Sequence, residues 1–493
     1  MLTANSTVPP RLRAALTCHS LNLIGGNWSP AASGETFPVV NPAAPGDLLA
    51  AFPASEPSDV QDAVEAAHEA LPGWSAMPAP ERARILDRAI TLLEARAEEL
   101  AYALTWEEGK AIAEARVEVR RGLDAMAFLA AEGRRMGGQT LPSAQPNMLA
   151  FSQRRPLGVV GIITPWNFPF AIPAWKLAPA LITGNTVVFK PAEQTPICAM
   201  LLAEALQEAG LPPGVLNVVH GAGAVGRELV AHPLVRGISF TGSTAVGKEI
   251  NAAAASRLAK VQLELGGKNA AIVLADADLD LAAREIAAAA WGSSGQRCTA
   301  TSRLIVQREV AEQLVGKLLA LAPGYRVGSG FDPEVKVGPV IEASALARIE
   351  SYLDLARQEG ASVAIGGHRL SGDGYFFAPT VLTGVSPVMT VAQEEIFGPV
   401  LSVIEVESLE EAIAVSNAVS YGLSSALYTR DLAAALGYAR NAATGLLHVN
   451  CSSIYSEIQL PFGGIKDSGF GGREMGPTAI DFYTEWQTVY MQG

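Results

Sequence analysis

The stretch Ser-Ser-Gly-Gln-Arg-Cys-Thr, residues 293–299, decides how the rest of this sequence is interpreted. Cys298 is one of four cysteines, and it follows a small, flexible segment that contains Gly295. Upstream, Glu264 stands in Leu-Glu-Leu-Gly-Gly-Lys (263–268). A thiol that can ionise and a carboxylate that can take a proton from water suffice to form and then hydrolyse a thioester. The two stretches therefore predict covalent catalysis at Cys298 with Glu264 as general base.

Four further motifs occur along the chain, three before these two stretches and one after them. They are Thr-Pro-Trp-Asn-Phe-Pro (164–169), Phe-Lys-Pro-Ala-Glu (189–193), Phe-Thr-Gly-Ser-Thr (240–244) and Glu-Glu-Ile-Phe-Gly-Pro-Val (394–400). Together with the first two stretches, from about residue 21 to the end, they resemble the NAD(P)-dependent aldehyde dehydrogenase superfamily. The resemblance implies an α/β fold with a Rossmann-type NAD-binding domain, an α/β catalytic domain and a small oligomerisation arm.

The composition is typical of a large globular protein in a reducing compartment. The chain has 493 residues, of which 49% are hydrophobic, so we expect two or three domains. With 36 basic and 49 acidic residues the formal charge is −13, and there is no basic block, which argues against nucleic acid or an anionic membrane as a partner. We expect a cytoplasmic protein for three reasons. The four cysteines are scattered, no signal peptide is recognisable, and no apolar run is long enough to span a membrane.

Short apolar, β-branched segments alternate with alanine-rich helical windows through most of the chain, which is typical of a parallel sheet covered by helices. The first series of expected strands is 158–163, 186–190, 215–219, 237–240 and 260–264, and the second is 270–274, 302–306, 362–365, 400–405, 425–429 and 446–449.

The N-terminal part is helical in pattern. Ser58 and Gln61 have the spacing of a capping box, which predicts a helix over residues 59–71. A long amphipathic run from Pro80 to Arg135 is expected to break near its two glycines, Gly109 and Gly122.

The resemblance also implies a domain division. We expect residues 1–20 to be a poorly ordered extension and 267–466 to be the catalytic domain, with the chain reversal at Gly266–Gly267. The NAD-binding domain would take residues 21–134 and 154–266, and the oligomerisation element residues 135–153 and 482–493. An extended arm and a terminal strand offer edges for pairing with another subunit, so we expect a homodimer or homotetramer.

Cys298 is the expected nucleophile among the four cysteines. Arg297 beside it is expected to favour the thiolate electrostatically. Cys18 lies in the extension, and Cys198 has the apolar surroundings of a buried structural cysteine. Cys451 follows an expected strand and is a second thiol that could line the same cavity.

The remaining catalytic roles come from the resemblance. Glu264 has neighbouring glycines that give its side chain room, and a base there favours hydrolysis over transfer of the acyl group to coenzyme A. Asn167, in a loop stiffened by two prolines, is expected to donate to the developing oxyanion together with the backbone N–H of Cys298. Lys190 completes the catalytic set.

The cofactor is expected at the ends of the first series of strands, where open α/β sheets place their ligands. Lys190 and Glu193 would bind the adenosine ribose, and the carboxylate would repel a 2′-phosphate, which favours NAD over NADP. Gly242 and Ser243 precede a helix start that can hold the pyrophosphate. The other cofactor residues that the resemblance implies are Ile163, Thr164, Pro165, Trp166, Gly226, Phe240, Val246, Leu265, Glu395 and Phe397.

One glycine pattern is a weak signal. Gly221, Gly223 and Gly226 form the G-x-G-x-x-G spacing of a dinucleotide fingerprint. A tight turn explains the same glycines equally well, with Gly226 near the adenine end. The six histidines have no ligand spacing, so we expect no catalytic metal.

The substrate is expected to be an anionic semialdehyde. The stretches 165–176, 295–303 and 481–485 resemble the branch of the family that oxidises α-ketoglutarate semialdehyde (2,5-dioxopentanoate), and Arg297 suits a carboxylate because a guanidinium binds it bidentately. Segment 452–460 departs from that branch, so an aromatic or aliphatic aldehyde stays open. The residues expected to contact the substrate are Arg297, Thr299, Phe168, Tyr455 and Phe462.

Three other functions fit the sequence less well than an aldehyde dehydrogenase. A thiol hydrolase would leave the two ribose motifs without a role, and no histidine stands in a partner context for Cys298. A catalytically silent binding relative would have lost Cys298 or Glu264, and both are present. Coenzyme A acylation is disfavoured by Glu264.

Overall fold

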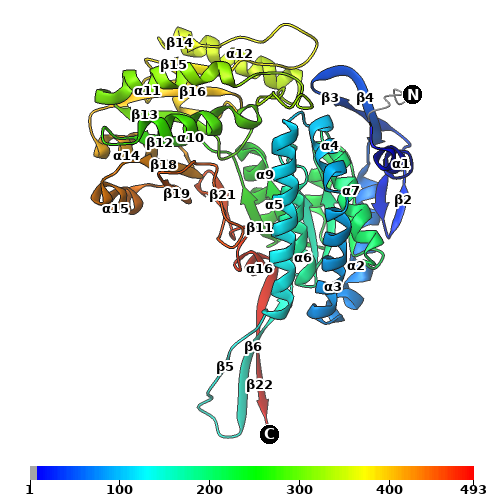
Figure 1. Ribbon diagram of the computed structural model, residues 1–493. Helices are drawn as coiled ribbons and strands as arrows, with labels where there is room; N and C mark the ends of the chain where they lie inside the picture. The colour runs from blue at the N-terminus through cyan, green and yellow to red at the C-terminus, as the bar shows by residue number, and fades with distance from the viewer. Residues whose placement is uncertain (1–7) are drawn as a thin grey trace.

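Two parallel-sheet bodies and a protruding arm make up the computed structural model, which describes residues 8–493 (Figure 1). The first sheet has eight strands in the order β2-β1-β9-β8-β7-β10-β11-β21, with β7 to β11 mutually parallel. The strands are β1 (Asn22–Ile24), β2 (Asn27–Ser29), β7 (Val159–Ile163), β8 (Thr186–Lys190), β9 (Leu216–Val218), β10 (Val235–Thr241), β11 (Lys260–Glu264) and β21 (Gly469–Phe470).

Alternate residues of this sheet enter two different cores. Val159 and Ile163 of β7 pack with α2, α8 and α9 on one face, and Val160 and Ile162 pack with α6 and α7 on the other. Helices α3, α4 and α5 form an outer layer over the second face. The helices are α2 (Pro57–Ala76), α3 (Ala79–Glu94), α4 (Ala97–Glu107), α5 (Ile112–Ala131), α6 (Ala171–Ile182), α7 (Pro196–Glu208), α8 (Gly223–Ala231) and α9 (Thr244–Ala255).

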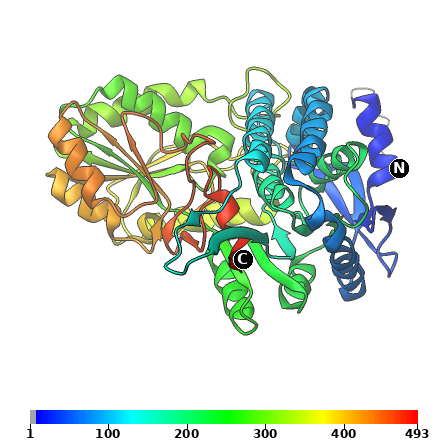
Figure 2. The same ribbon diagram turned by 90° about the horizontal axis from the view of Figure 1, so that it is seen from below.

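The second sheet has the order β14-β15-β16-β13-β12-β18-β19 and is parallel except for β14. Figure 2 shows helices on both of its faces. Its strands are β12 (Asn269–Val273), β13 (Thr301–Gln307), β14 (Ser362–Ile365), β15 (Thr380–Thr383), β16 (Val400–Val406), β18 (Ser424–Tyr428) and β19 (Leu446–Val449). Its helices are α10 (Leu279–Trp291), α11 (Arg308–Leu321), α12 (Ala343–Gln358), α13 (Thr390–Gln393), α14 (Leu409–Asn417) and α15 (Leu432–Asn441).

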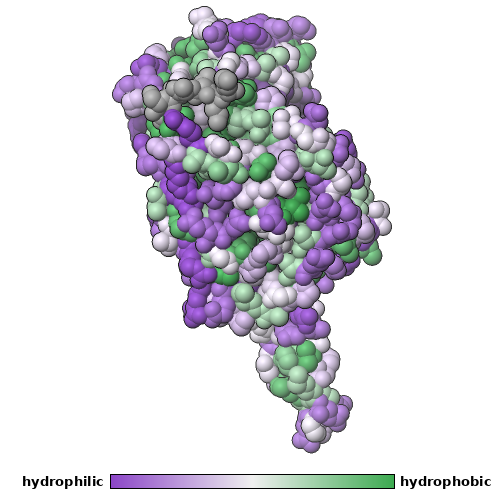
Figure 3. Space-filling model, turned by 90° about the vertical axis from the view of Figure 1, so that its right-hand side faces the viewer, coloured by the Kyte–Doolittle hydropathy of each residue, from purple (hydrophilic) through white to green (hydrophobic). Residues whose placement is uncertain are grey.

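A narrow arm extends away from both bodies. Strand β6 (Met148–Pro156) pairs along its whole length with the C-terminal β22 (Thr484–Gln492), and β5 (Thr140–Leu141) pairs with β6. Figure 3 shows hydrophobic residues gathered on this arm. The short elements that complete the chain are β3 (Thr36–Asn41), β4 (Ala44–Pro53), β17 (Tyr421–Gly422), β20 (Ile465–Lys466) and α16 (Ala479–Phe482).

The expected α/β fold is confirmed, and every expected strand is present, but the poorly ordered extension was wrong for residues 8–20. Residues Pro10–His19 form helix α1, which buries Leu12 completely in the first core. Arg11 on α1 forms ion pairs with Glu99 and Glu204. The apolar positions of this short helix were too few to predict it. Residues 1–7 lie outside the described part of the chain.

Helix boundaries differed from the expectation at two places. The capping box that opens α2 joins Glu56 and Asp59, two residues before the one expected at Ser58 and Gln61. The long amphipathic run breaks at Gly109 as expected, but Gly122 lies inside α5. A Cβ at Gly122 would come within 2.6 Å of the Phe170 ring, so this glycine allows α5 and α6 to pack closely.

Candidate active site

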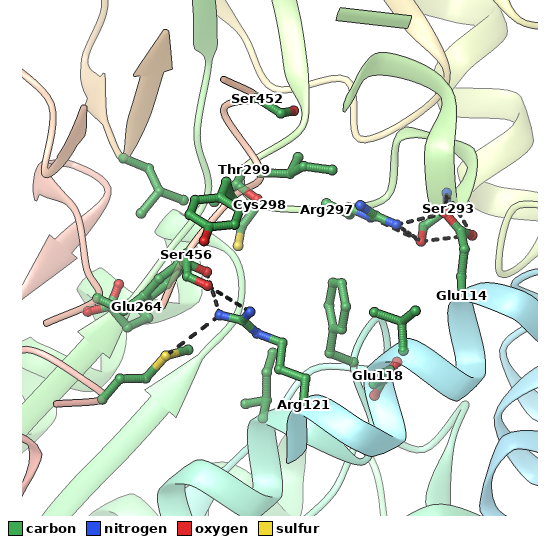
Figure 4. Close-up of a pocket in the computed structure, with 18 of the residues that line it drawn as sticks. Glu114, Glu118, Arg121, Glu264, Ser293, Arg297, Cys298, Thr299, Ser452 and Ser456 are labelled. Carbon is green, nitrogen blue, oxygen red and sulfur yellow. Dashed lines mark hydrogen bonds and ion pairs between the residues drawn. The ribbon is translucent and has the colours of Figure 1, made fainter. Parts of the chain in front are cut away.

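A cavity of about 720 Å³ lies between α5 and the loops that follow the strands of both sheets (Figure 4). Its wall includes Cys298 from the second body and Glu264 from the end of β11 in the first. The two residues that the sequence joined as nucleophile and base thus face one space, although they come from different sheets.

A strained loop precedes the nucleophile. Ser293 and Ser294 have φ angles of 46° and 56°, a left-handed conformation that is costly for residues other than glycine. Gly295 follows with φ 68°, and a Cβ there would lie 2.1 Å from the carbonyl oxygen of Gly398. The Ser294 hydroxyl donates to the Gly338 carbonyl at 2.7 Å, and the Gln296 side chain accepts from the Ile341 N–H at 2.9 Å. These contacts hold a backbone shape that presents Cys298 to the cavity.

The Cys298 thiol is protonated at rest. Burial, together with the nearby carboxylates of Glu395, Glu264 and Glu474, raises its pKa to about 12. The sequence predicted the opposite, a thiolate favoured by Arg297. A base must therefore remove the proton before Cys298 can attack a substrate.

Arg297 does not present a free guanidinium to the nucleophile. Its terminal nitrogen lies 2.7 Å from the Glu114 carboxylate on α5 and 2.9 Å from the Ser293 hydroxyl. Glu114 also accepts from the Ser293 backbone N–H at 3.0 Å. Figure 4 shows the Arg297 side chain directed toward Glu114, on the far side of Cys298 from Glu264. Arg297 therefore ties the nucleophile loop to α5.

Glu264 is buried, and its carboxylate accepts the Gly464 N–H at 3.3 Å. Burial and the charge of Glu474 raise its pKa well above the ordinary value, so this carboxyl holds a proton more tightly than an exposed one. Glu474 is itself ion-paired with the buried Lys176 and accepts from the Trp175 ring N–H at 2.8 Å.

Asn167 lies beside the nucleophile loop. Its side-chain amide donates to the Gln296 carbonyl at 2.9 Å, and its backbone carbonyl accepts from Lys110 at 2.7 Å. An amide nitrogen carries two hydrogens, so one remains for an oxyanion next to Cys298.

The residues expected to bind the cofactor gather where neighbouring parallel strands of the first sheet end. Lys190 ends β8 and lies 3.3 Å from the Glu193 carboxylate, and burial lowers the pKa of Lys190. Gly226 on α8 faces the side chains of Ile163 and Lys190. Ser243 is the N-cap of α9, where unpaired N–H groups can receive a phosphate. Phe240 and Gly242 precede it, Val246 lies in its first turn, and Thr164 and Pro165 follow β7.

The other expected cofactor residues, Trp166, Leu265, Glu395 and Phe397, lie nearer to the cavity. The Glu395 carboxylate accepts the Gly267 N–H at 2.9 Å, and a Cβ at Gly266 would lie 2.1 Å from a Glu395 oxygen. The Phe397 ring meets Trp166 edge-on at 5.5 Å. Leu265 is the residue of this set that contacts both α9 and the cavity of Cys298.

All five expected substrate residues line the cavity, Arg297 among them. Phe168 and Phe462 form apolar walls, Thr299 follows the nucleophile, and the exposed Tyr455 lies at the entrance. Cys451 lines it too.

Sequence analysis missed several residues of this wall. Arg121 on α5 and Ser456 enter the cavity, and Glu474 approaches it from the segment after β21. Arg121 follows an identical, exposed neighbour on an amphipathic helix, so nothing in the sequence distinguished it from a surface arginine.

Residues 8–493 contain neither a metal-ligand cluster nor a helix that could span a membrane. The four cysteines of the described chain are free.

The chain matches one family model and curated relatives along most of its length. The model of the aldehyde dehydrogenase family matches residues 28–489. Alpha-ketoglutaric semialdehyde dehydrogenase of Bacillus subtilis is 44% identical over 478 residues, which cover 96% of this chain and 98% of the relative. Malonate-semialdehyde dehydrogenase 2 of Geobacillus kaustophilus is 42% identical over 467 residues, with 94% and 96% covered.

Solved structures agree with this result. An NADP-dependent enzyme of E. coli has a TM-score of 0.94 and 38% identity over 97% of this chain and 99% of its own. An NAD-dependent aldehyde dehydrogenase of Sinorhizobium meliloti has a TM-score of 0.94 and 39% identity over 98% and 96%.

Proposed function

The chain belongs to the aldehyde dehydrogenase family, and we propose that it oxidises a carboxylate-bearing semialdehyde, α-ketoglutarate semialdehyde above all, to the acid with NAD. The observation that carries the proposal is the shared cavity of Cys298 and Glu264, next to a strand-end nucleotide site. An aldehyde in this cavity has a nucleophile and a base on its walls, and Asn167 lies beside the nucleophile loop.

The first half of the reaction forms a thioester. Cys298 loses its proton to Glu264, the carboxylate of raised pKa that lines the same cavity, and the sulfur attacks the aldehyde carbon. Asn167 and the Cys298 N–H stabilise the resulting oxyanion. A dinucleotide held by Lys190, Glu193 and the start of α9 would supply the hydride acceptor, and loss of hydride from the adduct on Cys298 leaves a thioester.

The second half of the reaction hydrolyses the thioester on Cys298. Glu264, after it has released its first proton, removes a proton from water, and the hydroxide adds to the thioester carbon. The carboxylic acid leaves, and the Cys298 sulfur regains a proton. Glu264 is suited to this second role because Gly463 and Gly464, which contact its carboxylate, leave it space on that side.

Glu193 supports NAD over NADP. Its carboxylate lies at the end of β8 and is partly exposed, where it would accept from the 2′-hydroxyl of the adenosine ribose. A 2′-phosphate there would meet a like charge. Lys190 beside Glu193 would donate to the same ribose.

The relatives support an anionic substrate. The names of both curated relatives specify semialdehydes that carry a carboxylate, and the chain is 44% and 42% identical to them over the aligned residues. The aromatic walls of Phe168 and Phe462 are the feature that favours the second candidate, an aromatic or aliphatic aldehyde.

We propose a homo-oligomeric assembly in a reducing, cytoplasmic compartment. The arm carries the exposed side chains of Trp486, Tyr490 and Met491 on an open strand, which supports pairing with a second copy. Free cysteines support the reducing compartment.

The test is NADH formation by absorbance, with wild type beside Cys298→Ala. The panel contains α-ketoglutarate semialdehyde, malonate semialdehyde, benzaldehyde and hexanal, each with NAD and with NADP. We expect the highest kcat/KM with α-ketoglutarate semialdehyde and NAD, and no turnover by the variant. A preference for benzaldehyde or hexanal would replace the proposed substrate class, and turnover by Cys298→Ala would overturn the mechanism.

A further inference from the structure

Three cationic side chains line the cavity, and two of them are neutralised by a carboxylate. Lys110 is ion-paired with Glu118, and Arg297 is ion-paired with Glu114. Arg121 is different. Among residues 8–493, no carboxylate oxygen lies within 4.0 Å of its guanidinium nitrogens.

The guanidinium of Arg121 is held in place by neutral groups. One terminal nitrogen donates to the Ser456 carbonyl at 2.8 Å, the other donates to the Ser456 hydroxyl, and the Met475 sulfur lies 4.0 Å away. Burial lowers the pKa of Arg121, and the longer-range charges of Glu457 and Asp124 only partly offset this effect. A partly buried cation without a counter-charge is costly unless a ligand supplies one.

Arg121 also has free hydrogen-bonding capacity. A guanidinium carries five N–H donors; two of them are used on Ser456, and a third is directed at the Met475 sulfur. The remaining donors can bind both oxygens of a carboxylate. Figure 4 shows the side chain rising from α5 into the cavity on the side opposite Cys298. A substrate that spans the cavity therefore reaches the thiol with one end and Arg121 with the other.

We propose that Arg121, fixed by Ser456, binds the carboxylate of the semialdehyde substrate and sets the enzyme's preference for anionic aldehydes, a role the sequence had assigned to Arg297. The inference rests on the proposed substrate class. Arg297 instead positions the nucleophile loop, because its donors are directed to Glu114 and Ser293.

Two substrates of equal chain length isolate this contact. 5-Oxopentanoate ends in a carboxylate, whereas pentanal has the same five-carbon chain with a methyl end. The quantity measured is the ratio of kcat/KM for the two, with wild type, Arg121→Met, Arg121→Lys and Ser456→Ala. Removing one partner of a desolvated charge pair typically costs ~30-fold or more, so we expect the ratio for Arg121→Met to fall at least about 30-fold, chiefly through KM.

The graded variants sharpen the test. Arg121→Lys keeps a charge but loses the bidentate fork, so its ratio should lie between those of wild type and Arg121→Met. Ser456→Ala should lower the ratio by a smaller factor than Arg121→Met, because the guanidinium keeps its charge but loses one anchor. If Arg121→Met proves too unstable to assay, these two variants carry the test.

Arg120→Met is the matched control. Arg120 is the preceding residue of α5, its side chain is exposed, and it pairs with Asp124 away from the cavity. We expect its ratio to equal that of wild type.

The outcomes separate the two proposals. This inference alone would be overturned if wild type prefers the acid aldehyde and Arg121→Met has the same ratio of kcat/KM as wild type. An equal loss of kcat/KM on both aldehydes in Arg121→Met would give that same result. A collapse of the ratio in Arg297→Met but not in Arg121→Met would return the role to Arg297. A wild-type enzyme without any preference for the acid aldehyde would overturn the proposed substrate class and this inference with it.

Discussion

At the scale of single residues, the protonation of Cys298 determines how catalysis begins. Its pKa of about 12 means that the thiolate is rare at neutral pH in the resting enzyme. Burial and three surrounding carboxylates cause this, and they protect the nucleophile from alkylation and oxidation until a base acts.

The reactivity of Cys298 should therefore keep rising with pH. Because the pKa is raised, the thiolate fraction at pH 7 is small and grows about tenfold for each pH unit below the pKa. We expect the rate of carboxamidomethylation by iodoacetamide in cofactor-free enzyme to rise without a plateau from pH 7 to 9.5, measured by mass spectrometry of the Cys298 peptide. The exposed Cys18 is an internal reference for the reagent. A rate already maximal at pH 7 would contradict the raised pKa.

The sequence could identify Cys298 and Glu264 because covalent catalysis restricts both residue type and context. It could not predict the state of Cys298, which depends on Glu395 and Glu474, distant in sequence and close in space. For the same reason it chose Arg297, adjacent to the nucleophile in sequence, and overlooked Arg121, which only the packing of α5 brings into the cavity.

At the scale of elements, the loop Gly292–Gly295 and Arg297 act as one unit. Their left-handed residues are stable only because Glu114 and Gly338 hold them from outside. Loss of the Arg297–Glu114 ion pair should let the loop relax and move the Cys298 sulfur.

Glu114→Gln and Arg297→Met should therefore reduce kcat for every aldehyde by a similar factor, on the order of 10–100-fold, because a displacement of about 1 Å can cost that much. The measurement is kcat on α-ketoglutarate semialdehyde and on pentanal. Arg116→Met is the control, since Arg116 lies on the same helix but pairs with Glu98 at the surface. Unequal losses on the two substrates would argue that the pair binds substrate directly.

The elements that the sequence predicted best are the buried parallel strands. Strands such as β7 and β8 are buried along their whole length and read as short runs of branched apolar residues. The N-terminal strands β1 to β4 were not predicted because they have mixed exposure, and β15 was also missed. Helix α1 was missed because the ion pairs that hold it, from Arg11 to Glu99 and Glu204, join residues far apart in the sequence.

At the scale of the whole molecule, the arm is a small sheet of three strands, β22, β6 and β5, that extends away from both bodies. Trp486 and Tyr490 on β22 remain more than half exposed, at 57% and 69%. Aromatic side chains on an open sheet edge are usually covered by another chain.

Light scattering coupled to size-exclusion chromatography should accordingly give wild type a mass of at least two chains. The double variant Trp486→Lys, Tyr490→Lys should dissociate to a smaller species, since two new charges oppose burial of the arm. Lys248→Glu, a change of an exposed residue on α9, is the control. A monomeric wild type, or an assembly unaffected by the double variant, would refute the role of the arm.

The central claim is that Cys298 carries an acyl group which Glu264 helps water to remove. The most direct measurement is intact mass spectrometry of acid-quenched Glu264→Gln after mixing with NAD and α-ketoglutarate semialdehyde, with NADH followed in parallel. The account predicts about one NADH per chain, formed more slowly than by wild type because Glu264 also takes the Cys298 proton, an acyl adduct located at Cys298, and a steady-state rate lower by ~10²–10⁴. NADH formation at the wild-type rate without an adduct on Cys298 would contradict it.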